Sequence, residues 1–362
     1  MNSKWVNATI KDIAEIKKGS YITKKDAKQG PYPVILGGRE PAYYINQYNH
    51  EGKAIVISRS GASAGYVSFW NENIFVTDGF VIEPKENISY EYLYYLLKSK
   101  QEELHYLQRG AAIPHVTPTL LYELKIQLPP FQIRERIGTI LEVYDKLIEN
   151  SLKQIKLLEE TAQRLYKEWF VDLHFPGYED AAIIDGMPEG WNKCLIGDVI
   201  GKVTRTKQIK TADYLIEGSI PVIDQSHDFI AGYTNDAEAI VNMDCPVIVF
   251  GDHTRILKYI QFPFAKGADG TQLIVSINKK MPQSLLYYSL IAVDLSNYHY
   301  ARHFKYLKAE SILVPTKEIA DKFERIVSSI LLQIQKLRDM SNKSSQARNR
   351  LLPKLMSGEL EV

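Results

Sequence analysis

Residues 132–170 read QIRERIGTILEVYDKLIENSLKQIKLLEETAQRLYKEWF, and this stretch decides the fold. It contains no proline and a single glycine, Gly138. Its apolar residues recur mostly at steps of three and four, which places them on one face of a helix. At about 1.5 Å per residue the helix would be about 57 Å long, roughly three times the usual globular length. Because such a helix cannot bury its apolar stripe alone, it requires a partner helix. The stripe consists of Ile133, Ile137, Ile140, Tyr144, Leu147, Ile148, Leu152, Ile155, Leu158, Ala162, Leu165 and Trp169.

A second stripe of the same kind lies near the C-terminus. It has no proline before Pro353, so the pattern predicts a second long helix from Ile319 to about Leu352. This helix is the natural partner of the first. Its stripe consists of Phe323, Ile326, Ile330, Ile334, Leu337, Met340, Ala347, Leu351 and Leu355.

The two helices belong to an internal duplication. Trp5 opens the pattern W-x4-I-x-D-I, and Trp191 opens W-x4-I-x-D-V, 186 residues later. The same offset separates Leu128-Pro129 from Val314-Pro315, each just before a long helix. With small shifts, Asp78-Gly79 resembles Asp269-Gly270, and Tyr94-Tyr95 resembles Tyr287-Tyr288. Two similar halves, each a globular module followed by a long helix, explain this set.

Each module is expected to be built on short strands. Residues 54–58, 66–70 and 75–84 in the first copy are rich in β-branched and aromatic residues and are bounded by Gly, Asp and Asn, as are residues 245–250, 256–262 and 271–277 in the second. A short helix follows in each copy, at residues 89–98 and 282–293. Residues 175–188, punctuated by proline and glycine, form a linker into the second module.

Composition limits the class of protein. The chain has 362 residues, of which 45% are hydrophobic and 24% are charged, and its net charge is +1. We expect a globular protein of more than one domain, with no secretory signal in its first residues and no membrane-spanning segment. Two cysteines are too few for a disulfide framework, which favours a reducing cytoplasm.

Two motifs raise the possibility of an enzyme, and both have simpler explanations. Residues 61–65 match the G-x-S-x-G nucleophile elbow, but the following residues alternate like a strand where the elbow needs a helix. We therefore predict a glycine-rich hairpin. Leu128-Pro129-Pro130-Phe131 resembles the Pro-Pro motif of amino-methyltransferases, yet leucine offers no acceptor to the amine, so a strand end and helix start are expected.

The sequence signals for a metal site are equally weak. Asp78 and residues 83–85 are too close together for a nuclease site on separate strands. His299 and His303 lack a third ligand, so no metal site is predicted.

Because its features come in this order and in two copies, the chain resembles the DNA-specificity (S) subunits of type I restriction-modification systems. The resemblance rests on the W-x4-I-x-D-I opening, Leu-Pro-Pro-x-Gln at 128–132, residues 250–255 (FGDHTR) with Asp269-Gly270 downstream, and LLPKLMSGEL at 351–360. It implies an α+β fold with two similar α/β target-recognition domains, each followed by a long helix, the helices pairing as an antiparallel coiled coil. The parts expected are target-recognition domain 1 (1–130), spacer helix 1 (131–175), the linker with target-recognition domain 2 (176–316), and spacer helix 2 with the C-terminal tail (317–362).

The resemblance also implies a function. Such a subunit is not an enzyme: each module reads one half of a bipartite double-stranded DNA site, and the coiled coil sets the spacing. Two modification (methyltransferase) subunits and restriction subunits are the expected partners, in the cytoplasm and with no membrane. The subunit itself needs no cofactor, because S-adenosylmethionine, ATP and Mg are expected only on the partners.

Divergent polar loops on a shared scaffold are the expected sites of base reading. Arginine pairs with guanine and polar side chains pair with adenine, so these residue types are the candidates. In the first module the candidates are Arg39, Arg59, Arg109 and His115. In the second they are Arg205, Gln225, His253, Arg255, Arg302 and Lys305.

Partner docking is expected on the helix faces turned away from the opposite helix and near Trp169, Phe170 and Leu355. Two other functions stay open from the residues alone. One is a single-chain nuclease or methyltransferase, against which the missing donor-binding and metal motifs argue. The other is a two-module adaptor that joins proteins through its coiled coil, against which the arginine-bearing loops argue.

Overall fold

A computed structural model describes residues 5–23, 25–38, 40–106, 115–201, 203–241, 246–298 and 302–362. The chain forms two compact units, one made of Met1–Asn150 with Met340–Val362 and the other of Ser151–Asp339. Both divisions fall inside a long helix. Each unit therefore holds one strand-rich module and a part of each helix.

The two long helices are present. α5 runs from Phe131 to Tyr166 and continues as a π-helical turn, Lys167–Val171. α9 runs from Lys317 to Ser357. The prediction that α9 would end near Leu352 is wrong, because Pro353 lies inside the helix. Proline removes one backbone hydrogen bond, but the buried side chains of Leu355 and Met356 anchor the turn that follows it.

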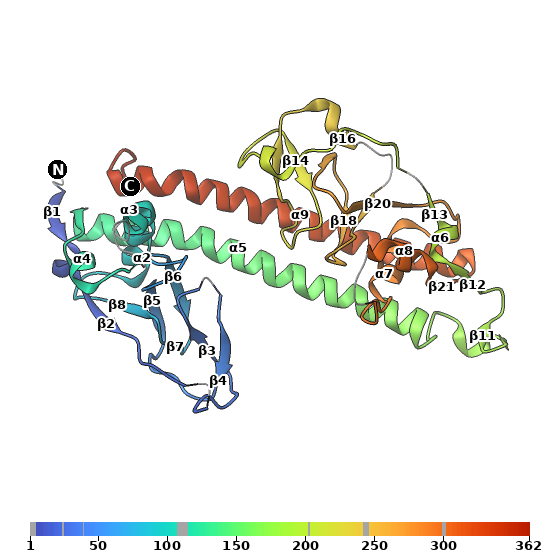
Figure 1. Ribbon diagram of the computed structural model, residues 1–362, viewed down its shortest axis with the longest axis horizontal. Helices are drawn as coiled ribbons and strands as arrows, with labels where there is room; N and C mark the ends of the chain where they lie inside the picture. The colour runs from blue at the N-terminus through green and yellow to red at the C-terminus, as the bar shows by residue number, and fades with distance from the viewer. Residues whose placement is uncertain are drawn as a thin grey trace. The chain divides into compact units, whose positions relative to one another are not determined.

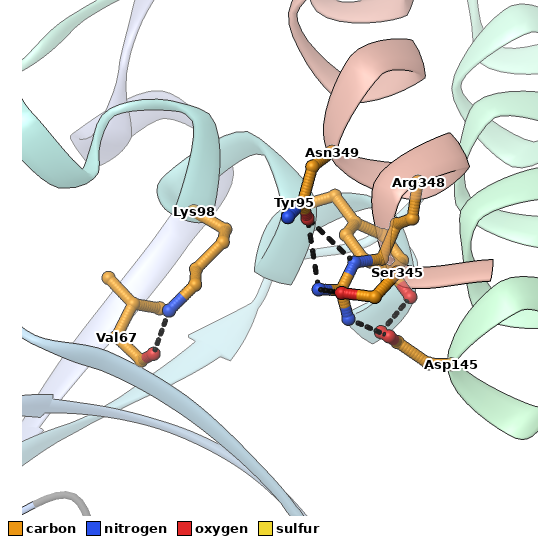
Figure 2. A network of polar contacts seen from close by, with 7 residues as sticks. All are labelled: Val67, Tyr95, Lys98, Asp145, Ser345, Arg348 and Asn349. Carbon is orange, nitrogen blue, oxygen red and sulfur yellow. Dashed lines mark hydrogen bonds and ion pairs between the residues drawn. The ribbon is translucent and has the colours of Figure 1, made fainter. Parts of the chain in front are cut away.

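The helices pack antiparallel within the first unit. Ile137 and Leu141 of α5 share a core with Leu355 of α9, and further along α5 Asp145 forms an ion pair with Arg348 (Figure 2). As residue numbers rise along α5, the residue numbers of its contacts on α9 fall, so the two helices run antiparallel.

The second unit shows the same direction of packing. Glu159 of α5 lies 2.7 Å from Arg338 of α9, and Tyr166 packs edge-on against Phe323 with ring centroids 6.2 Å apart. The predicted antiparallel helix pair is therefore confirmed by the contacts inside each unit.

The predicted stripes are partly wrong. The apolar stripe predicted from the spacing of three and four is wider than the strip of helix surface that one partner helix can cover. Residues at the edge of the stripe therefore stay exposed to solvent. The exposed members are Leu147 (39%), Leu152 (56%), Ile326 (45%) and Met340 (41%).

The aromatic end of α5 is core. Trp169 and Phe170 are 7% and 3% exposed and pack on Phe323, while Leu355 is fully buried in the first unit. These three side chains are covered by their own units, and the expected partner docking on the helix faces and ends near them stays a prediction.

The first module contains two larger sheets, drawn in blue in Figure 1, and an antiparallel pair of β1 with β9. One has the strand order β2-β8-β5-β6 and the other β4-β3-β7, with β3 and β7 parallel. β5 is buried on both faces, which explains its unbroken run of apolar residues. The strands are β1 Val6–Thr9, β2 Ala14–Lys18, β3 Tyr32–Ile35, β4 Tyr43–Ile45, β5 Lys53–Ser58, β6 Val67–Asn71, β7 Phe75–Val76, β8 Gly79–Pro84 and β9 Lys125–Leu128; the helices are α1 Ile10–Ile13, α2 Tyr90–Ser99, α3 Gln101–Tyr106 and α4 Pro118–Tyr122.

The second module repeats this topology, with one more strand, β16, in its smaller sheet and a β12-β21 pair in place of β1-β9. Its sheets have the orders β13-β20-β17-β18 and β15-β14-β19-β16, and β14 and β19 are parallel as β3 and β7 are. The duplication predicted from the sequence is thus present in the fold. The strands are β12 Asn192–Leu195, β13 Ile200–Gly201, β14 Ile220–Ile223, β15 Gly232–Thr234, β16 Ile240–Val241, β17 Val247–Gly251, β18 Leu257–Ile260, β19 Phe264–Lys266, β20 Thr271–Ser276 and β21 Ser311–Val314; the helices are α6 Ile196–Val199, α7 Gln283–Ile291 and α8 His303–Ala309, with 3-10 turns η3 Thr211–Asp213 and η4 Ala237–Ala239.

The linker between the modules is a small hairpin. After a 3-10 turn, η2 Tyr178–Asp180, strands β10 (Ile183–Ile184) and β11 (Met187–Pro188) pair antiparallel. Asp185 and Gly186, with φ of 49° and 76°, make the tight turn that such a hairpin requires. No described helix is at once long and apolar enough to cross a lipid bilayer.

Candidate nucleic-acid interface

The first candidate surface lies where β5 ends. The Arg59 backbone N–H donates to the Asp78 carbonyl (3.1 Å), and the Arg59 carbonyl accepts from the Val116 N–H (3.0 Å). Ser60 pairs with His115 in an isolated antiparallel bridge. The fold thus brings together two predicted candidates, Arg59 and His115, from segments far apart in sequence.

The Arg59 side chain has a partner. Its Nε lies 2.7 Å from Oδ1 of Asp78, an ion pair whose geometry is not that of an aligned hydrogen bond. The other Asp78 oxygen accepts from the Ser60 hydroxyl. The Arg59 side chain is 34% exposed, so the carboxylate orients it while leaving part of it accessible from solvent. Sequence reasoning did not assign this positioning role to Asp78, although the repeated Asp-Gly pair was a signal.

The other two candidates of the first module, Arg39 and Arg109, lie outside the described residues. Gly37, two residues before Arg39, lies close to Asp78. A Cβ at Gly37 would lie 3.4 Å from the carbonyl and the carboxylate of Asp78.

The second candidate surface centres on Arg255, which follows β17 with a left-handed φ of 62°. Its Nε donates to Nε2 of His303 (3.3 Å), and its Nη2 donates to the carbonyl of Tyr298 (3.3 Å). Burial lowers the pKa of His303, and the charge of Arg255 lowers it further. The imidazole is thus held neutral and can accept the arginine's hydrogen bond.

Gln225 supports the same loop. Its Nε2 donates to the carbonyl of Asp269 (2.8 Å), and its Oε1 accepts from the backbone of His253 (3.1 Å). The Thr254 hydroxyl donates to the Gln225 carbonyl (2.7 Å). Because both ends of the amide are engaged, its geometry is that of a residue positioning the loop, while the His253 side chain is exposed.

The remaining candidates of the second module surround this loop. Arg205, Arg302 and Lys305 are exposed. Burial lowers the pKa of Lys266; Asp269 partly offsets this, and the charge of Arg205 adds to it, which places Arg205 near that side of the loop. Gln208, which was not among the candidates, donates to a carboxylate oxygen of Asp269 (3.2 Å).

Backbone hydrogen bonds relate the two surfaces residue by residue. As Arg59 donates to Asp78, so Asp252 donates to the carbonyl of Gly270 (2.7 Å). Arg59 and Asp252 therefore hold the same backbone position. Asp78 matches Gly270, so the sequence alignment of Asp78-Gly79 with Asp269-Gly270 is wrong by one residue. From Arg59 to Asp78 the chain advances 19 residues, and from Asp252 to Gly270 it advances 18, so the second copy is one residue shorter between these positions.

A second pair of equivalent positions follows. Val116 donates to the Arg59 carbonyl, and His303 donates in the same way to the Asp252 carbonyl (2.9 Å). The residues just before them, His115 and Arg302, are then equivalent, and both are exposed. One scaffold thus presents different polar side chains at matched positions in the two modules.

The enzyme motifs take the simpler forms that were predicted. Residues 61–65 lie in the turn of the β5–β6 hairpin, and β6 is a strand, so the nucleophile elbow is absent. Leu128 ends β9 and Phe131 begins α5. Within the described part of the chain, no group of three or more His, Cys, Asp or Glu side chains could hold a metal ion. His299 falls outside that part, and His303 is 5% exposed.

Comparisons with known proteins agree with this arrangement. A family described as "Type I restriction modification DNA specificity domain" matches residues 2–160. The MjaIX type I restriction enzyme specificity subunit of Methanocaldococcus jannaschii is 26% identical over 99% of this chain and 94% of its own length. A putative type I specificity subunit of Mycoplasma pneumoniae is 31% identical over 46% of each chain.

A solved structure shares the fold. The S subunit of the type I restriction-modification system of M. genitalium aligns with a TM-score of 0.68 at 19% identity, covering 98% of this chain and 96% of that one. The duplicated modules, the paired helices and these matches point the same way: over its whole length the chain is similar to type I restriction-modification DNA-specificity subunits, and its residues 2–160 match the specificity-domain family.

Proposed function

We propose that this chain is the non-catalytic subunit that gives a type I restriction-modification complex its DNA sequence specificity. Each module reads one half of a bipartite site in double-stranded DNA. The antiparallel helices fix the number of base pairs between the half-sites, and partner subunits carry out adenine methylation and restriction.

One observation carries this proposal. The two modules share the strand order of their main four-stranded sheet, yet at equivalent backbone positions they present the exposed His115 against the exposed Arg302, and Arg59 stands where the second module has the buried Asp252. Side chains that project from loops on a common scaffold read base edges through their donor and acceptor patterns. Two modules that differ in this way suit two different half-sites.

The expected partners follow from the duplication. Two similar halves offer two similar seats, so the complex should contain two modification subunits for each copy of this chain, joined by restriction subunits. A complex saturated by a single modification subunit would contradict this. Catalysis, S-adenosylmethionine, ATP and Mg belong to those partners in this proposal, and the complex works in the cytoplasm, where its DNA is.

The net charge of +1 bears on which subunits of the complex contact the DNA phosphates. Phosphate contacts supply most of the salt-dependent affinity of a DNA-binding protein, and they require an excess of Lys and Arg. This chain has almost none overall. We therefore expect the partner subunits to provide much of the phosphate contact, while this chain contributes base contacts.

The test is a set of loop variants in the assembled complex. Arg59→Ala and His115→Ala should relax base preference only in the half-site of the first module, and Arg255→Ala and Arg302→Ala only in the other. Each should cost about 1–3 kcal/mol, measured by selection from a duplex library randomised at both half-sites. Arg59→Lys keeps the charge but loses the planar fork, so it should fail like alanine.

The exposed Lys279, in the turn after β20, provides the control. Lys279→Ala should leave both half-sites unchanged. If Arg59→Ala and Arg255→Ala both leave every base preference intact, these loops are not the readers.

A further inference from the structure

The second unit contains a cavity of about 440 Å³, and of the described residues proposed for base reading only Arg255 is among those that line it. It is lined by residues of β18 and the two positions before it, of the loop at 227–229, and of helices α5, α7 and α9. The side chains that matter here are Arg255, Lys258, Arg338, His227, Phe229 and Glu159.

The lining has an excess of positive charge. Three cationic side chains, Arg255, Lys258 and Arg338, face one carboxylate among the described lining residues, Glu159. That carboxylate is already committed, since it lies 2.7 Å from the guanidinium of Arg338. The guanidinium carbon of Arg338 also stacks 3.9 Å from the ring centroid of Phe229, which fixes it against the cavity wall.

The other two cations have only neutral acceptors. Lys258 donates to the backbone carbonyl of Asp228, and Arg255 donates to His303 and to the carbonyl of Tyr298. The nearby carboxylate of Asp224 is occupied by the Tyr214 hydroxyl (3.1 Å) and the Ser226 N–H (2.8 Å). Neither Lys258 nor Arg255 is therefore neutralised by a direct ion pair among the described residues.

Lys258 is the most unusual of the three. It points from strand β18 and is only 4% exposed. Burial lowers its pKa to about 8, and the attraction of Asp224 and Asp228 does not make up for that loss. A buried ammonium that makes no direct ion pair is costly, and an anion entering the cavity would reduce that cost.

We propose that this cavity is an anion site that receives a phosphate group, with Lys258 as its central ligand and Arg255 and Arg338 beside it. A phosphate carries the charge that offsets the excess, and it accepts hydrogen bonds from ammonium and guanidinium donors at once. The group can come from the DNA backbone or from a free phosphate compound. Only the first source rests on the proposed function.

The free-anion arm uses thermal melting of the full chain, with inorganic phosphate and chloride compared at equal ionic strength. Phosphate stabilises most proteins weakly and without saturation, so the signature is a saturable rise in the melting temperature. This measurement on the unaltered chain needs no variant. In Lys258→Met the saturable part should vanish, whereas in the exposed control Lys280→Met it should persist. Replacing a buried charge by an isosteric apolar side chain is compatible with folding.

The DNA arm uses the assembled complex. If a backbone phosphate occupies the cavity, Lys258→Met should weaken binding equally for all sequences and reduce the slope of log affinity against log salt by about one. Lys280→Met should leave the slope unchanged.

A saturable phosphate effect alone assigns a free anion, and a changed slope alone assigns the DNA backbone. No saturable effect together with an unchanged slope overturns the site. A complex that fails to bind DNA at all contradicts the proposed function instead, and the melting arm still decides about the cavity.

Discussion

The carboxylate of Asp145 on α5 accepts hydrogen bonds from both Arg348 on α9 and the hydroxyl of Tyr95 on α2 (Figure 2). Arg348 also reaches Ser345 and Asn349 on its own helix. Burial raises the pKa of Tyr95, and the adjacent carboxylate raises it further, so the phenol stays protonated and donates. One half-buried network therefore joins the first module to both long helices within this unit.

This network makes a measurable contribution to stability. Asp145→Asn or Arg348→Met leaves the other charge half-buried without its partner, and each should lower the free energy of unfolding by about 1–3 kcal/mol. The double variant should lose less than the sum, with a coupling energy of about 0.5–3 kcal/mol from urea unfolding. Lys146, which pairs with Glu142 on the exposed face of α5, is the control, and Lys146→Met should change stability by less than about 1 kcal/mol. Additive single effects would show that the pair contributes nothing.

The contact between His303 and Arg255 predicts a dependence on pH. The unfolded chain carries this histidine near its ordinary pKa of 6.5, whereas the folded value is lower. Below 6.5 the unfolded state therefore binds a proton that the folded state resists, so stability falls as the pH falls and is constant above that value. Asp252 and His253 also face the ring, and Asp252 acts in the opposite direction.

The matched variant is His303→Gln, because the glutamine carbonyl can accept the hydrogen bond from Arg255 but does not titrate. Between pH 7.5 and 5.5 the urea midpoint should fall more in the unaltered protein than in His303→Gln. Base preference in the second half-site should weaken over the same range. Equal pH profiles for the two proteins would remove His303 as the titrating group.

Gly270 gives a test of the second reading loop. Its φ is +81°, and a Cβ there would lie 2.8 Å from Nε2 of Gln225 and from Cδ2 of His253. Gly270→Ala should therefore push aside the Gln225 and His253 side chains, break the hydrogen bonds by which Gln225 holds the loop, and weaken recognition of one half-site. Gly186 has a φ of +76°, and a Cβ there would meet no heavy atom within 4 Å, so it has the same backbone strain without the collision.

Both substitutions should cost roughly 1–2 kcal/mol of stability from the left-handed backbone. Only Gly270→Ala should change base selection, measured with the randomised duplex library. Equal effects of the two variants on selection would mean that the loop does not need its present shape.

The elements of the fold could be predicted because their signals are local. The spacing of apolar residues in 132–170 identifies α5, and the runs around Ile55 and Val249 identify central strands. The end of α9 could not be predicted, because the proline rule is local while the burial of Leu355 is not. The same holds for Trp169, whose stripe position says that it packs but not on what.

The sequence predicted which loops carry the candidate surfaces, but it could not predict which side chains in those loops contact one another. Arg59 and Asp78 are close only because β5 and β8 pair, and that register is not written in either strand alone. Asp145 and Arg348, 203 residues apart, meet because of the helix pairing, and many registers are compatible with two apolar stripes. Residue types indicated chemistry, but tertiary contacts decided which side chains are held and which are exposed.

The long helices predict how the two half-sites are spaced. One helical turn adds about 5.4 Å, against ~3.4 Å per base pair along the duplex. Four residues inserted near Ser151, with four more near Ser341, add about one turn to both helices and keep the stripes nearly in phase. The gap between half-sites should lengthen by about one to two base pairs, while the bases read in each half-site stay the same.

Inserting four residues in only one helix is the matched control, because it breaks the pairing register and should lower affinity without defining a new spacing. The added turn also rotates one module slightly, so some affinity is lost even where the spacing shifts as expected. The readout is methylated-site profiling of the assembled complex on libraries with variable gaps. A double insertion that changes the bases read, or that leaves the gap as it was, would show that helix length does not set the spacing.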